Sequence, residues 1–174
     1  PEGEEEGHRK RLVERLFESR IILLAEPVSA ELSEAVVAKM LLLDAEDKKA
    51  PIDLYINSPG GSVDAGFANY DMARFISAPV RCVCNGLTAS AAVLVLLAAP
   101  KKQRLSLPNS RFLIHQPSGG ARGSTADFEI EAHQILRIRE RINVLIAEET
   151  GQALEKVDQD TRRNYWMEAP EAME

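Results

Sequence analysis

Short apolar runs alternate along this chain with segments that have the spacing of amphipathic helices, and this order constrains the fold most strongly. The runs at 20–24, 52–56 and 80–84 are typical of buried strands, and a segment with helical spacing follows each of them. Parallel strands need a crossover between them, so the alternation predicts an α/β fold with parallel pairing. The expected helices cover 29–43, 64–76, 88–99, 126–149 and 152–164, with further short strands at 104–107 and 111–114 and a turn at 85–86.

The whole chain, residues 1–174, is expected to form a single domain. A chain of 174 residues can bury a sizeable core, and the sequence contains neither an internal repeat nor a low-complexity linker. Residues 1–10 are charged and contain glycine, which predicts a mobile N-terminal segment, followed by a short amphipathic helix.

Composition excludes several classes of partner. The net charge of −6 argues against a nucleic-acid partner, which would need a basic face. No apolar stretch reaches the roughly 18–20 residues that span a bilayer, so we expect no membrane partner. The acidic N-terminus shows no signal peptide, and Cys82 and Cys84 fit small buried residues of a reducing compartment, so a cytoplasmic location is expected. No histidine clusters with these cysteines, and we expect no metal site and no cofactor.

Two residues suggest nucleophilic chemistry. Ser90 precedes a run of small and apolar residues that is expected to form a buried helix, and His115 follows an expected strand. A serine hydroxyl needs a base such as imidazole to act as a nucleophile, and a helix N-terminus favours the negative charge of an attacked carbonyl. The glycine-rich run at 57–62 could face the same point. Each of these signals also has an ordinary explanation when it is considered alone. Ser90 could be a helix cap, His115 a hydrogen-bonded core histidine and Gly60–Gly61 a turn.

The expected helix at 126–149 is longer than a domain of this size needs. Phe128, Ile135 and Ile142 repeat every seven residues, as do Ile138 and Leu145, which is typical of a coiled-coil-like seam. Two interpretations remain open. The stripe packs on the core of its own chain, or the helix projects and packs against another subunit.

Four runs, LYINSPGGSVDAG, NGLTASAAVLVLLAA, LPNSRFLIHQPSGG and APEAME, closely resemble the proteolytic subunit of the ATP-dependent Clp protease. The resemblance implies an α/β fold of repeated strand–helix units, related to the crotonase fold, that form a head with a protruding handle helix. It further implies a cytoplasmic serine endopeptidase that degrades unfolded polypeptides inside two stacked heptameric rings. An AAA+ ATPase would feed the barrel, and the rings would contain this chain alone or together with a paralogue.

Site residues carry over from the resemblance one by one. Ser90 matches the nucleophile and His115 the general base. The backbone N–H groups of Gly61 and Ala91 match the oxyanion hole, and the helix at 126–149 matches the handle that interlocks the rings. The run SGGARG matches the strand that binds the substrate main chain, which makes Ser118, Gly119 and Gly120 the candidate substrate-binding residues.

The third triad position departs from the family pattern. Asn164 stands where an aspartate is usual. An amide can orient His115 but cannot offer a negative charge to the imidazolium. In a well-studied serine protease an Asp-to-Asn change leaves the geometry intact but lowers kcat by ~10⁴ through the wrong tautomer. The chain is therefore expected to be slow or to need help. Asp160, four residues earlier in the same expected helix, is a candidate substitute carboxylate, with capping or ion pairing as its ordinary role.

Two further departures concern contacts with partners. Arg162 stands where the family has an acid that pairs across the ring interface with the arginine matched by Arg163, so a neighbouring subunit with an extra acid would suit this chain better. Tyr55 and Phe75 match aromatic positions of the docking pocket for the ATPase, but Asp53 replaces another aromatic and weakens an apolar pocket.

Three functions follow from these observations. The first is an active serine peptidase subunit, which the intact Ser90 and His115 favour. The second is a weakly active or non-catalytic scaffold subunit of a mixed barrel, which Asn164, Arg162 and Asp53 favour. The third is an acyl-CoA enzyme of the crotonase type, and the serine–histidine motifs argue against it because that chemistry needs no serine nucleophile.

Overall fold

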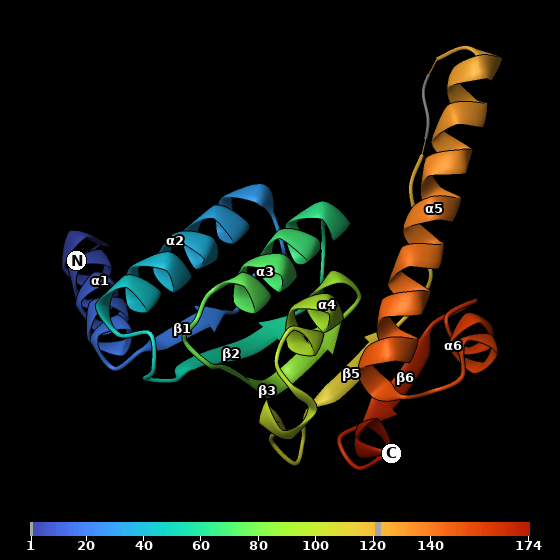
Figure 1. The fold of residues 1–174 in the computed structure, drawn as a ribbon. Helices are drawn as coiled ribbons and strands as arrows, with labels where there is room; N and C mark the ends of the chain where they lie inside the picture. Colours follow the sequence, from blue (N-terminus) through green and yellow to red (C-terminus); the bar gives the residue numbers. More distant parts are fainter. Residues whose placement is uncertain (1, 121–122) are drawn as a thin grey trace.

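The computed structural model describes residues 2–120 and 123–174, without the side chains of residues 2–6 and 8–10. One six-stranded sheet runs through the molecule in the order β1-β2-β3-β5-β6, and β4 pairs with another part of β3. The helices α2, α3 and α4 lie over one face of this sheet, and α5 rises from the end of the molecule that carries β6 (Figure 1). The strands are β1 (Ile21–Leu24), β2 (Ile52–Ser58), β3 (Val80–Ala89), β4 (Arg104–Ser106), β5 (Arg111–Ile114) and β6 (Tyr165–Glu168).

The helices follow the order that the sequence predicts, and several of their ends are set by local capping. Ser29 accepts a hydrogen bond from Leu32 and caps α2, and Ser62 does the same for α3 through Ala65. Gly151 ends α5 in the left-handed conformation, with φ of 81°. The helices are α1 (Glu2–Glu18), α2 (Ala30–Glu46), α3 (Val63–Phe75), α4 (Ala91–Leu97), α5 (Thr125–Thr150) and α6 (Leu154–Asp160), with short 3₁₀ turns η1 (Lys101–Gln103) and η2 (Glu171–Met173).

Parallel pairing and a layer of buried apolar side chains under the helices stabilise the central strands. β1 pairs with β2, and β2 pairs with β3, both in parallel. Ile52, Leu54 and Ile56 alternate along β2 and are fully buried, and they belong to one cluster with Met40 of α2 and Val95 of α4. Full burial of such a side chain contributes about 1.5–3 kcal/mol. This core fixes the strand ends that carry the site.

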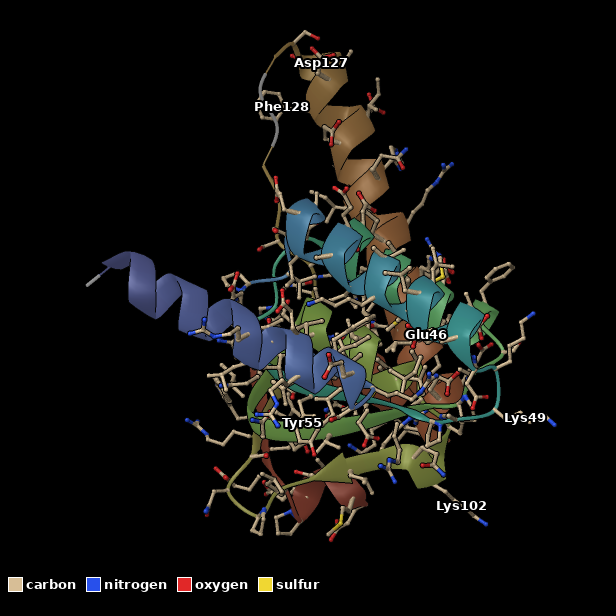
Figure 2. All side chains as sticks on the ribbon, turned by 90° about the vertical axis from the view of Figure 1, so that its left-hand side faces the viewer. Glu46, Lys49, Tyr55, Lys102, Asp127 and Phe128 are labelled. Carbon is tan, nitrogen blue, oxygen red and sulfur yellow. The ribbon has the colours of Figure 1, made fainter. Side chains whose placement is uncertain are left out.

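The two halves of α5 have different surroundings. Ile142 and Ile146 in its C-terminal half are buried in a cluster with Leu94 of α4. Phe128 and Leu136 in its N-terminal half are 51% and 56% exposed. Figure 2 shows Phe128 near the tip of α5, well away from the sheet that carries Tyr55. Simple packing on the chain's own core therefore explains the C-terminal half only.

Three boundaries differ from the sequence predictions. Helix α1 covers Glu2–Glu18, so it includes residues 2–10, which were expected to precede the first helix. β3 continues through Asn85 and Gly86, where a turn was expected, because Leu87 to Ala89 pair with β5. The helix that was expected to begin at residue 88 therefore begins at Ala91. The last predicted helix stops at Asp160, and β6 follows it as an antiparallel partner of β5.

Within the described part of the chain, no helix is both long enough and apolar enough to cross a membrane.

Candidate active site

Ser90 lies at a sharp turn between a strand and a helix. β3 ends at Ala89 and α4 begins at Ala91, and Ser90 between them has φ of 55° and ψ of −124°. Such a conformation costs a non-glycine residue about 1–3 kcal/mol. Hydrogen bonds hold the turn, because the Ser90 N–H donates to the carbonyl of Leu113 and the Val93 N–H donates to the carbonyl of Ser90, each at 2.9 Å. The hydroxyl does not cap α4, which leaves it free for another partner.

The glycine-rich run after β2 packs directly against this turn. A Cβ atom at Gly60 would lie 2.5 Å from the carbonyl oxygen of Ala89 and 2.7 Å from the Cβ of Ser90. Gly60 also has φ of 86°, a conformation that favours glycine. The run at 57–62 therefore faces Ser90, as the sequence suggested, and only glycine fits at position 60.

His115 follows β5 and reaches both neighbours of the site. Its Nε2 atom lies 2.9 Å from the Oγ of Ser90, and its Nδ1 atom lies 3.0 Å from the Oδ1 of Asn164. The amide oxygen of Asn164 can only accept a hydrogen bond, so in this arrangement Nδ1 carries the proton and Nε2 is the acceptor. The imidazole is therefore set to take the proton of the Ser90 hydroxyl.

Strand register explains why Asn164 meets His115. Ile114, the last residue of β5, pairs with Tyr165, the first residue of β6, and the two strands are antiparallel. The residue after Ile114 and the residue before Tyr165 therefore face each other. A second tie lies next to them, because the Gln116 N–H donates to the carbonyl of Thr161 at 2.6 Å.

Among the described residues, the backbone N–H groups of Gly61 and Ala91, the residues that follow Gly60 and Ser90, have no partner in the secondary structure. Ala91 is the first residue of α4, so its N–H has no intrahelical acceptor. Gly61 forms a bridge with Val28 that uses the carbonyl of Gly60 and the N–H of Ser62, which leaves the Gly61 N–H outside the ladder. Backbone N–H groups without a partner are the kind of donor that can stabilise an oxyanion.

Comparisons with known proteins decide the family. A family model described as Clp protease matches residues 3–174. The ATP-dependent Clp protease proteolytic subunit 2 of Treponema pallidum (strain Nichols) is 48% identical over 161 residues, which cover 92% of this chain and 81% of that protein. The chain belongs to the Clp protease family. A solved structure of an asparagine-to-aspartate mutant of ClpP1 from Listeria monocytogenes superposes with a TM-score of 0.85, at 44% identity, over 92% of this chain and 90% of that one.

Membership confirms the predicted fold and the predicted class of activity. Clp proteolytic subunits are serine peptidases, so this chain is a hydrolase of peptide bonds. This finding argues against the alternative of an acyl-CoA enzyme of the crotonase type. Which residues perform the catalysis in this member of the Clp protease family is inferred from the geometry above.

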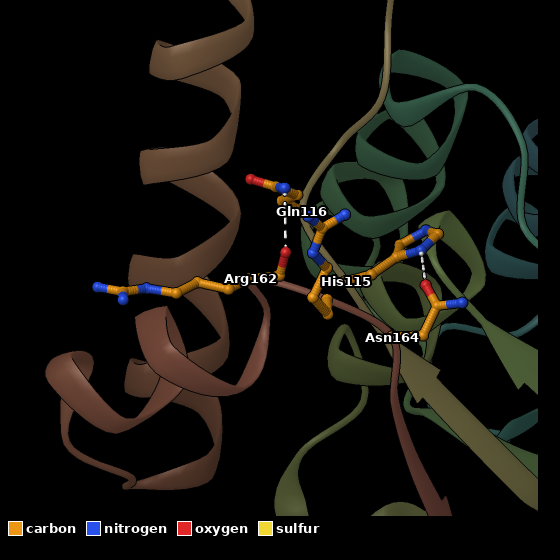
Figure 3. Close-up of a pocket in the computed structure, with 5 residues that line it drawn as sticks. His115, Gln116, Arg162 and Asn164 are labelled. Carbon is orange, nitrogen blue, oxygen red and sulfur yellow. Dashed lines mark hydrogen bonds between the residues drawn. The ribbon is translucent and has the colours of Figure 1, made fainter.

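A cleft opens on the Asn164 side of the site. It has a volume of about 400 Å³ and is lined by His115, Gln116, Arg162, Arg163 and Asn164 (Figure 3). The Gln116 side-chain amide donates to the carbonyl of Arg162 at 3.0 Å. Sequence reasoning treated Arg162 and Arg163 only as subunit contacts and missed that both border the active site. The signal for it lay in their position directly before Asn164.

The candidate substrate-binding residues follow the site along the chain. Ser118, Gly119 and Gly120 come after His115 and are exposed. A Cβ atom at Gly119 would lie 2.9 Å from the Cδ1 of Ile135, so this segment runs close to α5. The rest of the SGGARG run includes residues 121 and 122, which lie outside the described residues.

Asp160 is not placed as the sequence suggested. It ends α6, whereas Asn164 lies beyond the helix, so the two do not share a helix face. Its Oδ2 atom lies 2.5 Å from the Nζ of Lys156. This hydrogen bond raises the pKa of the lysine. The structure thus gives Asp160 an ion pair of its own.

Asp53 is also paired. Both of its oxygens accept hydrogen bonds from the guanidinium of Arg81, each at 2.6 Å, and these bonds raise the pKa of Arg81. Phe75 is 80% exposed at the end of α3. Asp53 and Arg81 therefore place two charged groups at the surface that the resemblance matches to the docking pocket for the ATPase.

The two cysteines are buried and free. Burial raises the pKa of Cys84 to about 11 and that of Cys82 further, which makes both thiols poor nucleophiles. Among the residues that the structure describes, no group of three or more potential ligands could hold a metal ion.

Proposed function

We propose that this chain cleaves peptide bonds through an acyl-enzyme on Ser90, with His115 as general base and Asn164 as the residue that orients it. The observation that carries the proposal is the 2.9 Å contact between Ser90 Oγ and His115 Nε2, while Nδ1 of the same ring is held by Asn164. Two consecutive hydrogen bonds through the His115 ring thus connect the nucleophile, the base and the orienting group.

The reaction follows from these positions. As Ser90 Oγ attacks the carbonyl carbon, its proton moves to Nε2 of His115, and the N–H groups of Gly61 and Ala91 stabilise the oxyanion. The imidazolium then gives this proton to the leaving amine, and the C–N bond breaks. A water molecule then attacks the ester carbonyl, with His115 again as the base, and the C–O bond to Ser90 breaks. This step releases the acid and restores the Ser90 hydroxyl.

Asn164 limits the rate in this scheme. It fixes the same tautomer that an aspartate would fix, but its neutral amide does not stabilise the imidazolium. We therefore propose an enzyme of low intrinsic activity. The same observation favours a second candidate, a subunit that mainly shapes a mixed barrel in which a paralogue cleaves faster.

The assembly that we propose is a pair of stacked heptameric rings. The exposed apolar residues of the N-terminal half of α5 support it, because a monomer gains nothing from them. The rings contain this chain alone or with a paralogue, and the numbered name of the Treponema relative, subunit 2, fits a paralogue. Unfolded polypeptides are the proposed substrates and an AAA+ ATPase the proposed feeder. The proposed compartment is the cytoplasm, where buried free thiols stay reduced.

A fluorophosphonate probe tests the proposal directly. Labelling is expected at Ser90 and is expected to vanish in Ser90→Ala. Ser106→Ala serves as the control, because Ser106 is an exposed serine on β4 that the mechanism does not use. Stoichiometric labelling at any other residue would contradict the assignment, and an intact particle without labelling or hydrolysis would favour the scaffold candidate.

A further inference from the structure

The proposed mechanism uses neither Asn57 nor Ser58, the two polar residues that end β2. Both come directly before the glycine turn, and Ser58 is fully buried. The Leu87 N–H donates a hydrogen bond to the Oδ1 of Asn57 at 3.0 Å, which fixes the end of β2 to β3. A buried hydroxyl is costly unless it is paired, so the partners of Ser58 indicate its role.

Ser58 connects two backbone segments that are far apart in the sequence. Its Oγ donates a hydrogen bond to the carbonyl of Glu26 at 2.7 Å and accepts one from the Gly60 N–H at 3.2 Å. Two residues after Glu26, the Val28 N–H donates to the carbonyl of Gly60 at 2.9 Å. One side chain therefore binds both the glycine turn and the segment that the turn contacts.

The backbone hydrogen bond from Val28 orients the N–H group of Gly61. The peptide between Gly60 and Gly61 is trans, so its carbonyl and its N–H point in opposite directions. The carbonyl faces Val28, and the N–H therefore points away from Val28. The turn at Ser90 packs against Gly60, since a Cβ atom there would lie 2.7 Å from the Cβ of Ser90. The Gly61 N–H is thus available to the side of the turn on which Ser90 lies.

This orientation depends on support from outside the turn. Gly60 and Gly61 have φ of 86° and 155°, and glycine restricts its own backbone torsions least. A rotation of the peptide between them would bring a carbonyl oxygen to the place of the N–H and would repel a developing negative charge. Each of the two peptides that flank Gly60 is held by one hydrogen bond, one through Ser58 and the other through Val28.

We propose that Ser58 is a positioning residue for the oxyanion hole. It holds the glycine turn and the segment at Val28 in one arrangement, so that the Gly61 N–H stays directed at the oxygen that becomes charged. The proposal rests on the proposed function, since it takes Ser90 as the nucleophile. Ser58 acts only through the turn, and no proton passes through it.

Ser110 offers a matched control. It is also fully buried, its Oγ donates to the carbonyl of Cys84 at 2.8 Å, and it accepts a hydrogen bond from the Gly86 N–H at 3.3 Å. Ser58→Ala and Ser110→Ala therefore remove the same kinds of bond from equally buried places, and similar decreases in Tm are expected. Only the bonds of Ser58 include the turn that packs against Ser90.

Labelling kinetics measure the effect on the reacting centre. The rate constant for the reaction of a fluorophosphonate with Ser90 is expected to fall about tenfold or more in Ser58→Ala, but by less than the ~10²–10³-fold that is lost when such a donor is removed outright. Ser110→Ala is expected to react at the wild-type rate. A rate constant does not depend on the fraction of enzyme that is folded, so a loss of stability does not imitate this result.

Peptide hydrolysis gives a second readout. In Ser58→Ala kcat, corrected for the number of active sites, is expected to fall by a similar factor while KM changes little, because the hole binds the oxyanion more strongly than the ground-state carbonyl. If Ser58→Ala does not fold, Ser58→Cys and Ser110→Cys replace the two alanine variants, since a thiol is a weaker donor and acceptor than a hydroxyl.

Hydrogen exchange separates this inference from the proposed function. The backbone amides of 57–62 are expected to exchange faster in Ser58→Ala than in the wild type or in Ser110→Ala. Equal labelling rates in Ser58→Ala and the wild type, or equal losses in both variants, would overturn the positioning role while the peptidase stands. If Ser90 does not react even in the wild type, the proposed function fails and exchange decides. Faster exchange only in Ser58→Ala would then support Ser58 as the residue that holds the turn, and unchanged exchange would overturn it.

Discussion

The Ser90 side and the Asn164 side of the active site are built differently. Ser90 lies between a buried strand and a buried helix, and Gly60 packs against it so closely that a methyl group would not fit. Arg162, Arg163 and Asn164 are all exposed. Positions that are packed on every side tolerate little change, whereas exposed ones can vary at small cost in stability. The Asn164 side is therefore where this enzyme can be tuned.

The largest expected effect comes from restoring a carboxylate on the exposed side. Asn164→Asp is expected to raise kcat for a small peptide, because a carboxylate stabilises the imidazolium that forms on His115. The gain is expected to stay well below the ~10⁴ known from a serine protease in which asparagine holds the wrong tautomer, because Asn164 already holds the catalytic one. Steady-state hydrolysis with equal active-site titres measures it. Asp160→Ala is the control, and its kcat is expected to change little because Asp160 pairs with Lys156. Loss of activity in Asp160→Ala, with no gain in Asn164→Asp, would make Asp160 the third member of the triad.

A single methyl group on the buried side is expected to act in the opposite direction. Gly60→Ala would place Cβ 2.5 Å from the carbonyl of Ala89, so the turn at Ser90 must shift. A displacement of about 1 Å at a reacting group can cost ~10²-fold in rate. Gly7→Ala in α1 is the matched control, because no atom of the described residues lies within 4 Å of the added Cβ. Equal kcat/KM in both variants would show that the buried side is less constrained than its packing indicates.

Sequence alone predicted the buried side well, because its signals are local. The apolar strand runs, the glycine-rich run at 57–62 and the small apolar run after Ser90 each lie within or directly beside the element they define. The exposed side depends on pairing between distant segments. β6 exists because Tyr165 pairs with Ile114, about fifty positions earlier, and this register brings Asn164 to His115. No short window of sequence contains that information, and the resemblance to a family supplied the third residue.

The charged lining of the cleft was missed for the same reason. Arg162 and Arg163 follow α6 and give no periodic signal, and their place beside His115 depends on the backbone contact of Gln116 with Thr161. Asp53 was recognised as a departure, but its partner Arg81 comes from the neighbouring strand, where Asp53 and Arg81 are directly opposed. Pairs of this kind become visible only when the register is known.

The two halves of α5 repeat the contrast between buried and exposed regions. Ile142→Glu would bury an unpaired charge in the chain's own core and is expected to cost several kcal/mol in the free energy of unfolding. Phe128→Glu changes an exposed residue and is expected to leave the fold intact while it weakens assembly. Chemical denaturation and sedimentation of both variants separate the two effects. An unchanged particle in Phe128→Glu would contradict an interface role for the N-terminal half.

The smallest expected effect tests whether the exposed charges contribute to stability at all. Asp158 accepts a hydrogen bond from Arg139, which lowers the pKa of its carboxyl in the folded state. A depressed folded-state pKa means that the pair stabilises the fold above the unfolded pKa of about 3.9, and that this stability is lost as the pH falls through the folded value. Asp158→Asn is therefore expected to lower Tm slightly at pH 7, and its difference from the wild type is expected to shrink as the pH falls below about 4. Solvent and salt screen this exposed pair, so the effect on Tm should also decrease in 0.5 M salt.

Thermal melts at three pH values would reveal this difference in Tm. Asp71→Asn is the control, because Asp71 is an exposed carboxylate away from the ion pairs of Asp158. A Tm difference that does not vary with pH would show that the amide acts through packing and that the charge of Asp158 contributes nothing to stability.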